Sequence, residues 1–508
     1  MNIADSVERG SSLFPHQTAL VFEEKSFTYQ ELDRLASRVA NGLRGLGVNQ
    51  GDRVALFLPN IPEFIFSYLG ILKLGAIAVS VNIMFKTEEV SYILNDCTAK
   101  IVITTASHCQ YVADLPQLQQ ILIAEGESDR GLSLTKMMAC ADSQMRSIQV
   151  EPNTPASIVY TSGTTGFSKG ATLSHGNIIS NVKAHNLCCG ITKADKLLLF
   201  LPLFHCFGQN AILNAGLCAG ATIVLQRRFK IERLLATISA CKVTMFFGVP
   251  TVFIKLLNAD ISPQIFSSIR YYFSAAASMP VEVVKNWQDK YGAIIYEGYG
   301  MTETSPCASY NHRAQYKLGS VGMPIENIAI KIVNPHGCPL PPGQLGEIAI
   351  KGPNVMLGYW NRPQETAKAI KDGWFHSGDL GIMDERGYLY IVDRLKDTIN
   401  MSGFKVYPTE VEQLIYQHPA VREVAIYGAS DPVKGEIVKA NIVLKNIARP
   451  IPKTQIEEFC SQRLANYKVP QEINFVETLP KSSTGKILKR VLRQESDYPK
   501  AQHVRAVR

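Results

Sequence analysis

Short apolar runs alternate with amphipathic stretches along most of the chain, and this alternation limits the possible folds more than any other feature. The runs at residues 53–58, 100–104 and 221–225 are typical of buried strands. The stretches from Tyr29 to Leu46 and from Ile61 to Leu74 place their apolar residues at helical spacing. Because strands that alternate with helices form largely parallel sheets, we expect an α/β fold built in layers.

The later part of the chain changes character twice. From Leu318 to Val392, short strands are punctuated by Pro and Gly, which predicts a β-rich subdomain. A helix near residues 408–418 and strands near residues 421–428 and 437–444 then predict a compact α+β unit.

A chain of 508 residues is several times longer than an ordinary domain, so we expect at least two domains. We predict a large N-terminal domain at residues 1–393, made of layered α/β subdomains and the β-rich subdomain. A small, mobile α+β C-terminal domain follows at residues 394–508. The boundary, and with it a hinge, is placed at about residues 393–397.

The composition, with 46% hydrophobic and 19% charged residues, is that of a folded soluble protein. A net charge of +8 favours anionic ligands such as nucleotides and coenzyme A. No motif that reads nucleic acid is present, so we expect no nucleic-acid partner. The first residues lack the basic start and apolar run of a secretory signal, and no apolar run reaches the roughly 20 residues of a membrane span. We therefore expect a cytoplasmic protein without a transmembrane segment.

The eleven cysteines show no paired C-x-x-C spacing. Cys188 and Cys189 are adjacent and Cys206 follows His205, but no partner pair at the spacing of a zinc site accompanies them. We interpret the cysteines as reduced thiols of the core or of a pocket, with neither a disulfide framework nor a zinc site.

The most informative segment is a loop of glycines, hydroxyl side chains and one lysine that follows a predicted strand at residue 158. Glycines let backbone N–H groups approach phosphate oxygens, the hydroxyls add short donors, and the lysine adds positive charge. The spacing is not that of a Walker loop. The predicted phosphate-binding residues are Thr161, Ser162, Gly163, Thr164 and Thr165, with Lys169 at the end of the loop.

The string Thr-Ser-Gly-Thr-Thr-Gly-x-x-Lys resembles the phosphate signature of the adenylate-forming superfamily of acyl-CoA synthetases, peptide-synthetase adenylation domains and luciferases. Four further segments match that superfamily in its order, so the resemblance covers essentially the whole chain and is nearest to the AMP-forming fatty acyl-CoA synthetases. They begin at Tyr296, Trp374, Val392 and Leu479. The resemblance implies ATP-dependent conversion of a carboxylic acid to an acyl-adenylate with release of pyrophosphate, followed by transfer of the acyl group to a thiol.

The segment Tyr296-Glu-Gly-Tyr-Gly-Met-Thr-Glu-Thr resembles the adenine and metal motif of the superfamily. The resemblance implies that Tyr299 and Gly300 lie against adenine, that Thr302 binds the α-phosphate and that Glu303 binds Mg²⁺. Mg²⁺ prefers carboxylate and phosphate oxygens, so Glu303 suits the role chemically. Ala276 and Ala277 are implied on the adenine side, although the segment Ser-Ala-Ala-Ala-Ser departs from the superfamily's Gly-rich form.

Three further segments are implied to act on the nucleotide and on the domain movement. Asp379, in Ser-Gly-Asp, would accept both ribose hydroxyls, since a carboxylate can pair with a vicinal diol. Arg394 would approach the ribose or phosphate, and Lys396 would be the pivot of the hinge. Lys486 matches the catalytic lysine, a cation that would bridge the carboxylate and the polyphosphate.

His205 matches the aromatic gate of the acid pocket in acyl-CoA synthetases. No acidic residue lies between Phe204 and Asn214, where amino-acid adenylation domains usually carry an Asp for the substrate ammonium. An apolar pocket in which Gly248 and Gly298 leave room for an alkyl chain favours a medium- to long-chain fatty acid, and an aryl acid stays open. The predicted pocket residues are His205, Phe207, Phe246, Gly248, Ser274 and Gly298.

The thiol acceptor is predicted to be coenzyme A. The segment from Asn400 to Glu412 resembles the branch that uses coenzyme A, with Gly403 lining the pantetheine tunnel and Lys405 meeting phosphate. The phosphopantetheine arm of an acyl carrier protein, in a polyketide or non-ribosomal peptide pathway, is an alternative acceptor. A luciferase-like oxidase or a nucleotide-binding pseudoenzyme would share most of the motifs.

Overall fold

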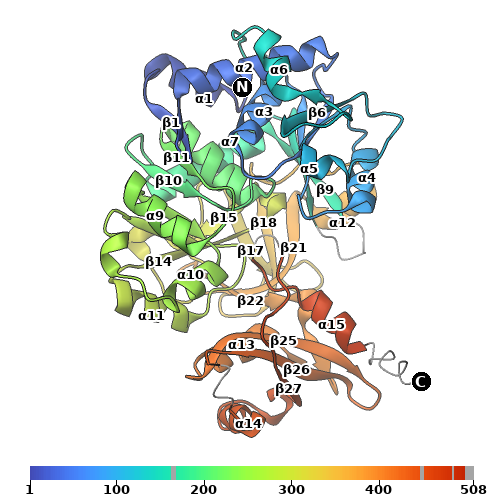
Figure 1. The fold of residues 1–508 in the computed structure, drawn as a ribbon. Helices are drawn as coiled ribbons and strands as arrows, with labels where there is room; N and C mark the ends of the chain where they lie inside the picture. Colours follow the sequence, from blue (N-terminus) through green and yellow to red (C-terminus); the bar gives the residue numbers. More distant parts are fainter. Residues whose placement is uncertain (162–167, 447–450, 483–484, 498–508) are drawn as a thin grey trace, which may run out of the picture.

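The computed structural model describes residues 1–161, 168–446, 451–482 and 485–497 (Figure 1). Two large sheets form the N-terminal domain. In the first, the strands from β14 to β1 are parallel, and antiparallel strands extend both edges. Its order is β16 (Met323–Pro324), β15 (Cys307–Tyr310), β14 (Ile295–Gly300), β13 (Tyr271–Ser274), β12 (Met245–Gly248), β10 (Lys196–Leu199), β11 (Thr222–Leu225), β1 (Thr18–Phe22) and β2 (Lys25–Thr28).

The second large sheet is parallel from β8 to β7, and β9 and β19 extend it by antiparallel pairing. Its order is β19 (Gly358–Tyr359), β9 (Lys169–Ser174), β8 (Pro155–Thr161), β4 (Ile77–Ser80), β3 (Arg53–Phe57), β5 (Ile101–Thr105), β6 (Gln120–Glu125) and β7 (Leu132–Ser133). The α/β prediction is confirmed, and the apolar runs at residues 53–58, 100–104 and 221–225 form strands β3, β5 and β11.

The main hydrophobic core contains buried residues of both large sheets and of the helices that pack on them. Helix α2 begins where a capping box forms between Thr28 and Glu31, and it buries Leu32, Val39 and Leu43 at helical spacing. The helices of this domain are α1 (Asp5–Leu13), α2 (Tyr29–Gly45), α3 (Pro62–Lys73), α4 (Thr87–Asp96), α5 (Ala106–Cys109), α6 (Leu134–Cys140), α7 (His175–Cys189), α8 (Ala215–Ala219), α9 (Ile231–Cys241), α10 (Pro250–Leu257) and α11 (Val281–Tyr291), with a π-helix at Phe207–Asn214.

The β-rich subdomain is an antiparallel sheet with one short helix, α12 (Pro363–Ala369). Its strands are β17 (Ala329–Val333), β18 (Gly346–Lys351), β20 (Ile370–Lys371), β21 (Trp374–Met383) and β22 (Leu389–Arg394). Strand β22 ends at Arg394, inside the range where the sequence places the domain boundary.

The C-terminal domain lies at the end of the molecule away from α1 and α6 (Figure 1). Its five-stranded sheet and its helices enclose a separate core. The strands are β23 (Ile399–Met401), β24 (Phe404–Val406), β25 (Val421–Asp431), β26 (Gly435–Leu444) and β27 (Glu472–Phe475), and the helices are α13 (Pro408–Tyr416), α14 (Lys453–Ser461) and α15 (Lys489–Asp497).

Over the described ranges, no helix is both long and apolar enough to cross a bilayer. The eleven cysteines carry free thiols.

A fully buried lysine ties three helices together in the N-terminal domain. The ammonium of Lys73, at the end of α3, lies 2.6 Å from Glu8 Oε1 of α1 and 2.8 Å from Asp33 Oδ1 of α2. It also donates to the carbonyl oxygen of Met145 at 2.8 Å. A buried charge is stable only when it is paired in this way. Removal of one partner leaves the remaining charges without a counter-charge, which lowers the free energy of unfolding.

We expect Lys73→Met to lower the free energy of unfolding of the N-terminal domain by about 3–5 kcal/mol, because the partly buried Glu8 and Asp33 lose a fully buried counter-charge. Urea unfolding measures the change. Lys100→Met is the control, since the Lys100–Asp52 pair at 2.6 Å is partly exposed and should contribute less than about 1 kcal/mol. Equal losses in the two variants would contradict the expectation.

Candidate active site

Two residues predicted to hold the nucleotide, Tyr299 and Arg394, contact the carboxylate of a third, Asp379. Asp379 of β21 and Arg394 of β22 are cross-strand neighbours, and Arg394 Nε lies 3.3 Å from Asp379 Oδ1. Tyr299 Oη, from the end of β14, donates to Asp379 Oδ2 at 2.8 Å. The Asp379 side chain is buried, and both of its oxygens are engaged. The β-rich subdomain and the first large sheet therefore meet at this residue.

The turn after β14 has no room for a side chain at Gly300, because a Cβ there would lie 1.8 Å from the carbonyl oxygen of Pro306. Two residues on, Thr302 is buried, and its Oγ1 accepts a hydrogen bond from Cys206 Sγ at 3.4 Å. Cys206 is the neighbour of His205. This contact joins the predicted α-phosphate residue to the predicted acid gate.

Glu303 and Lys169 both contact Tyr359, a residue that the motifs did not identify. Tyr359 Oη donates to Glu303 Oε1 at 3.0 Å, and Lys169 Nζ lies 5.2 Å from the centre of the Tyr359 ring. Burial raises the pKa of Glu303, and the Tyr359 hydroxyl acts against that rise by favouring the carboxylate. Tyr359 thus brings together Glu303, which is predicted to bind the metal ion, and Lys169, which is predicted to bind phosphate.

The ends of the predicted phosphate loop are fixed, although its centre is not described. Thr161 ends β8 and Lys169 begins β9, and the two residues are paired in the antiparallel ladder. The strands on either side of the loop are therefore adjacent, and Lys169 lies beside Tyr359. The remaining predicted residues, Ser162, Gly163, Thr164 and Thr165, lie outside the described residues.

Lys486 lies within electrostatic range of His205, Asp379 and Arg394. Burial first, and Arg394 second, lower the pKa of Lys486 to about 7. The pKa of His205 is lowered to about 4 by burial and by the charge of Lys486. The loop before Lys486 also touches the N-terminal domain, because a Cβ on Gly485 would lie 2.7 Å from Thr251 Oγ1. The predicted catalytic lysine is therefore delivered to the predicted nucleotide residues.

The predicted hinge is held at both ends. On one side, the Asp393 carboxylate accepts from the backbone N–H of Arg394 and from that of Thr409, at the start of α13, both at 2.7 Å. On the other side, Arg493 of α15 donates to the carbonyl oxygens of Lys396 at 3.2 Å and Asp397 at 3.1 Å. The Lys396 residue itself is exposed. Helix α15 directly follows the Lys486 segment, so hinge and catalytic loop are linked.

Gly403 and Lys405 are not brought to this site. They lie in the exposed hairpin of β23 and β24, where Gly403 has a φ of 86°. Between them, the Phe404 ring stacks on Tyr467 of the same domain at 4.8 Å. Within the part of the chain that the structure describes, no hydrogen bond or ion pair joins Gly403 or Lys405 to the N-terminal domain. Their contact with coenzyme A stays a prediction.

The predicted pocket residues are divided between the two faces of the first large sheet. Gly248 and Ser274 are register partners, and Gly248 and Phe246 lie two residues apart, so all three share one face. Phe246 packs there on Phe253 of α10 at a ring distance of 5.5 Å. On the opposite face Phe207 packs edge-on against Phe273 at 6.1 Å.

Neither glycine borders open space. A Cβ on Gly298 would lie 2.5 Å from Phe273 Cζ, on the face of Phe207. A Cβ on Gly248 would lie 3.0 Å from a carbon of Phe253. The space beside each glycine is taken by an aromatic ring of the core, Phe273 at Gly298 and Phe253 at Gly248. The expected room for an alkyl chain is not at these two positions. Their membership of the acid pocket stays a prediction.

The segment after β13 has an unusual backbone. Ala276 adopts a φ of 73°, the left-handed region in which a residue with a Cβ is disfavoured and glycine is not. This is where the sequence departs from the Gly-rich form of the superfamily. Ala276 and Ala277 are half-buried near the carboxyl end of the sheet, and their contact with adenine stays a prediction.

Glu297 is a buried acid in the middle of β14 that the motifs did not single out. It is the register partner of Ser274, and burial raises the pKa of Glu297 to about 8. Within the described residues, Glu297 Oε1, Ser274 Oγ and Tyr316 Oη have no hydrogen-bond partner. A charged residue inside an otherwise apolar strand was the signal that could have found it.

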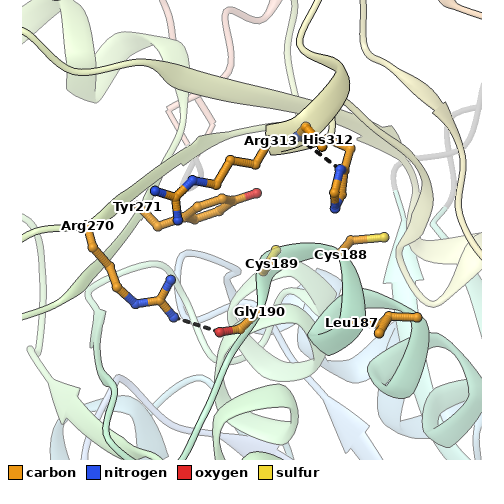
Figure 2. A pocket seen from close by; sticks show the side chains of 9 residues that line it. Leu187, Cys188, Cys189, Gly190, Arg270, Tyr271, His312 and Arg313 are labelled. Carbon is orange, nitrogen blue, oxygen red and sulfur yellow. Dashed lines mark hydrogen bonds between the residues drawn. The ribbon is translucent and has the colours of Figure 1, made fainter.

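A hollow of about 520 Å³ lies at the other end of β13, next to Tyr271. Figure 2 shows Arg270 donating to Gly190 at the end of α7, with His312 and Arg313 on the opposite side. The charge of Arg270 is balanced by Asp195 at 2.7 Å. The lining contains none of the predicted site residues, so this hollow is separate from the candidate active site.

A metal ion at the candidate site would depend on Glu303. Over the described ranges, no group of three or more His, Cys, Asp and Glu side chains is arranged to hold a metal ion. Mg²⁺ usually binds one or two carboxylates and takes its other ligands from phosphates and water. Glu303 as a single protein ligand therefore fits a magnesium ion that arrives with a nucleotide.

Comparison with known sequences identifies two matching regions. Residues 7–360 match the family described as AMP-binding enzyme, and residues 410–486 match the AMP-binding enzyme C-terminal domain. A feruloyl-CoA synthase from an Amycolatopsis species is 36% identical over 494 residues, which cover 96% of this chain and 97% of that protein. A long-chain-fatty-acid–CoA ligase from Bacillus subtilis is 34% identical, over 97% of this chain and 93% of that protein.

The arrangement of the whole chain also has a solved counterpart. The anthranilate CoA ligase AuaEII, solved in complex with anthranoyl-AMP, matches with a TM-score of 0.92 and 30% identity. The match covers 98% of this chain and 97% of that chain, and so includes both domains.

The pKa of Glu297 leads to a prediction for stability. A folded-state pKa of about 8, above the ordinary 4.5, gives a contribution to stability that is present below about pH 4.5 and is lost as the pH rises through 8. We expect the difference between the melting temperatures of Glu297→Gln and the wild type to shift in favour of Glu297→Gln, by about 1 °C or more, when the pH is raised from 5.5 to 8. The exposed Glu127→Gln should follow the wild type at both pH values. A constant difference between Glu297→Gln and the wild type would contradict the assignment.

Proposed function

This chain belongs to the AMP-binding enzyme family, and we propose that it joins an apolar carboxylic acid to the thiol of coenzyme A through an acyl-adenylate. The resemblance to the adenylate-forming superfamily is confirmed, and the family is one of AMP-forming CoA ligases that use ATP and coenzyme A. The observation that supports the proposal most is that Lys486 lies within electrostatic range of the paired residues Asp379 and Arg394.

In the first half-reaction, a carboxylate oxygen of the acid attacks the α-phosphorus of ATP, and the bond to pyrophosphate breaks. Lys486, as a cation, orients the carboxylate against the phosphate and stabilises the charge that develops. Asp379 accepts the ribose hydroxyls, and Thr302 binds the α-phosphate. Mg²⁺, bound by Glu303 together with phosphate oxygens, would neutralise charge on the polyphosphate.

In the second half-reaction, the thiol attacks the carbonyl carbon of the adenylate, the thioester forms and AMP leaves. We propose that residues 394–508 turn about the hinge at residues 393–397, with Lys396 as the pivot. The exposed hairpin with Gly403 and Lys405 would then replace Lys486 at the site. The fit to a ligase bound to an acyl-adenylate supports the present arrangement as that of the first half-reaction.

The acid is proposed to be apolar and compact. The acid gate at His205 has no carboxylate for an ammonium group between Phe204 and Asn214. Phe273 fills the space beside Gly298, which favours a flat aryl acid over a long alkyl chain. A fatty acid is the second candidate, because one relative is a long-chain-fatty-acid–CoA ligase.

Coenzyme A is preferred over a carrier protein as acceptor, because both relatives compared above form CoA thioesters by name. A carrier-protein arm and oxidation of the adenylate are the remaining outcomes of a substrate test. A cytoplasmic location stays a prediction.

The substrate prediction is tested with a panel of cinnamic, benzoic, fatty and amino acids, each assayed with coenzyme A and with a carrier protein in its phosphopantetheine form. We expect kcat/KM for the best aryl acid to exceed that for C12 to C16 fatty acids by about tenfold, because Phe273 fills the space beside Gly298. A long-chain fatty acid as the best substrate would contradict this proposal and support the alkyl alternative. Light or oxygen uptake would indicate an oxidase.

Lys486→Ala is expected to reduce acid-dependent ATP–pyrophosphate exchange by about 10²-fold or more, because the cation between the reactants is lost. Formation of the thioester from preformed acyl-adenylate should stay within about twofold of the wild type, since Lys486 acts only in the first step. Equal loss of both steps would contradict the assignment.

The same lysine predicts a pH dependence. With a pKa of about 7 in the free enzyme, Lys486 loses its proton above neutrality, so kcat/KM for adenylation should fall as the pH rises. Lys486→Arg should lose this limb of the profile, because a guanidinium stays charged.

A further inference from the structure

Tyr359 sits at the crossing of two segments that lie far apart in the sequence. It forms strand β19 with Gly358, and its register partner is Ala171 on β9, the strand that begins at Lys169. The N–H of Trp360 donates to the carbonyl oxygen of Gly170 at 2.7 Å. The backbone of Tyr359 is therefore fixed against the strand that leaves the phosphate loop.

Helix α12 holds Tyr359 from the other side. The N–H of Tyr359 donates to Thr366 Oγ1 at 2.9 Å. At Gly358 a Cβ would lie 2.7 Å from a carbon of Thr366, and the φ of this glycine is 146°. Position 358 therefore needs glycine, and helix α12 holds the backbone of Tyr359 through Thr366.

The segment that carries Tyr359 also forms a backbone hydrogen bond with Glu303. The N–H of Met356 donates to the carbonyl oxygen of Glu303 at 2.9 Å, while Tyr359 Oη donates to its carboxylate at 3.0 Å. The hydroxyl therefore engages Oε1 of Glu303.

The face of the same ring receives Lys169, whose ammonium lies 5.2 Å from the ring centre. This distance is within the range of a favourable cation–π contact. One side chain therefore holds a cation through its ring and an anion through its hydroxyl. Lys169 is the residue that the sequence assigns to the phosphates, and Glu303 is the residue that it assigns to the metal ion.

We propose that Tyr359 is a positioning residue that fixes Glu303 for the divalent cation and Lys169 for the phosphates of ATP. This proposal rests on the proposed function. The hydroxyl and the ring make separable contributions: the hydroxyl orients Glu303, and the ring orients Lys169. Tyr359→Phe removes the first contribution alone, and Tyr359→Leu removes both.

The test measures the dissociation constant of ATP by titration calorimetry, once with excess Mg²⁺ and once with EDTA. For Tyr359→Phe we expect binding in EDTA within about twofold of the wild type, and a loss of about tenfold in the gain in affinity that Mg²⁺ provides, as for a lost bond to a charged group. Tyr359→Leu should in addition bind about threefold more weakly in EDTA, because Lys169 loses its contact with the ring.

Tyr390→Phe is the matched control, because Tyr390 Oη also donates to a carboxylate, that of Asp384, at 3.2 Å. It should behave as the wild type in both titrations. Melting temperatures of all variants confirm that they are folded.

Glu303→Gln separates the two proposals. If Glu303→Gln loses the gain from Mg²⁺ and Tyr359→Phe keeps it in full, the role of Tyr359 is overturned and the proposed function stands. If Glu303→Gln itself keeps the full gain, the metal role of Glu303 is wrong, and the role of Tyr359 falls with it.

Discussion

The buried carboxylate of Asp379 is the contact on which the rest of the site depends. It accepts from Tyr299 of the first large sheet and pairs with Arg394, the last residue of β22. A buried carboxylate is stable only when its oxygens are engaged, so the sheet and the β-rich subdomain are held in one relative position. Because Arg394 also lies in the predicted hinge, a single strand register places both the predicted nucleotide residues and the predicted domain boundary.

The other residues of the candidate site lie at one edge of the first large sheet, because parallel strands end on the same edge. Strand β10 leads to His205, β12 to Thr251, and β14 to Tyr299 and Glu303. Ligands of open α/β sheets bind outside the carboxyl ends of the strands. The C-terminal domain approaches that edge with Gly485 against Thr251, which brings Lys486 to the place where the loops of the N-terminal domain converge.

Much of the fold could be predicted from the sequence because local signals agreed with it. Helix α2 begins at Tyr29, as expected, where Thr28 and Glu31 cap it, and the apolar run at residues 53–58 gives β3. The nucleotide motifs gave Tyr299, Asp379 and Arg394, which the structure brings together. The boundary at residues 393–397 and the role of Lys396 stay predictions.

The residues that the sequence could not provide depend on long-range packing. Tyr359 reaches Glu303 only because β19 returns to pair with β9, and no local pattern shows that pairing. The two glycines proposed to open a pocket lie on opposite sheet faces, a consequence of strand register. The π-helix at Phe207–Asn214 could not be predicted from the sequence either, since its composition is that of an ordinary buried helix.

The aromatic core has a consequence for spectroscopy. The chain has three tryptophans, and all of them, Trp287, Trp360 and Trp374, precede the hinge. Trp287 is fully buried among Phe253, Phe266 and Tyr272. Tryptophan emission therefore arises from the N-terminal domain alone, and the small domain that carries Lys486 is dark in this signal.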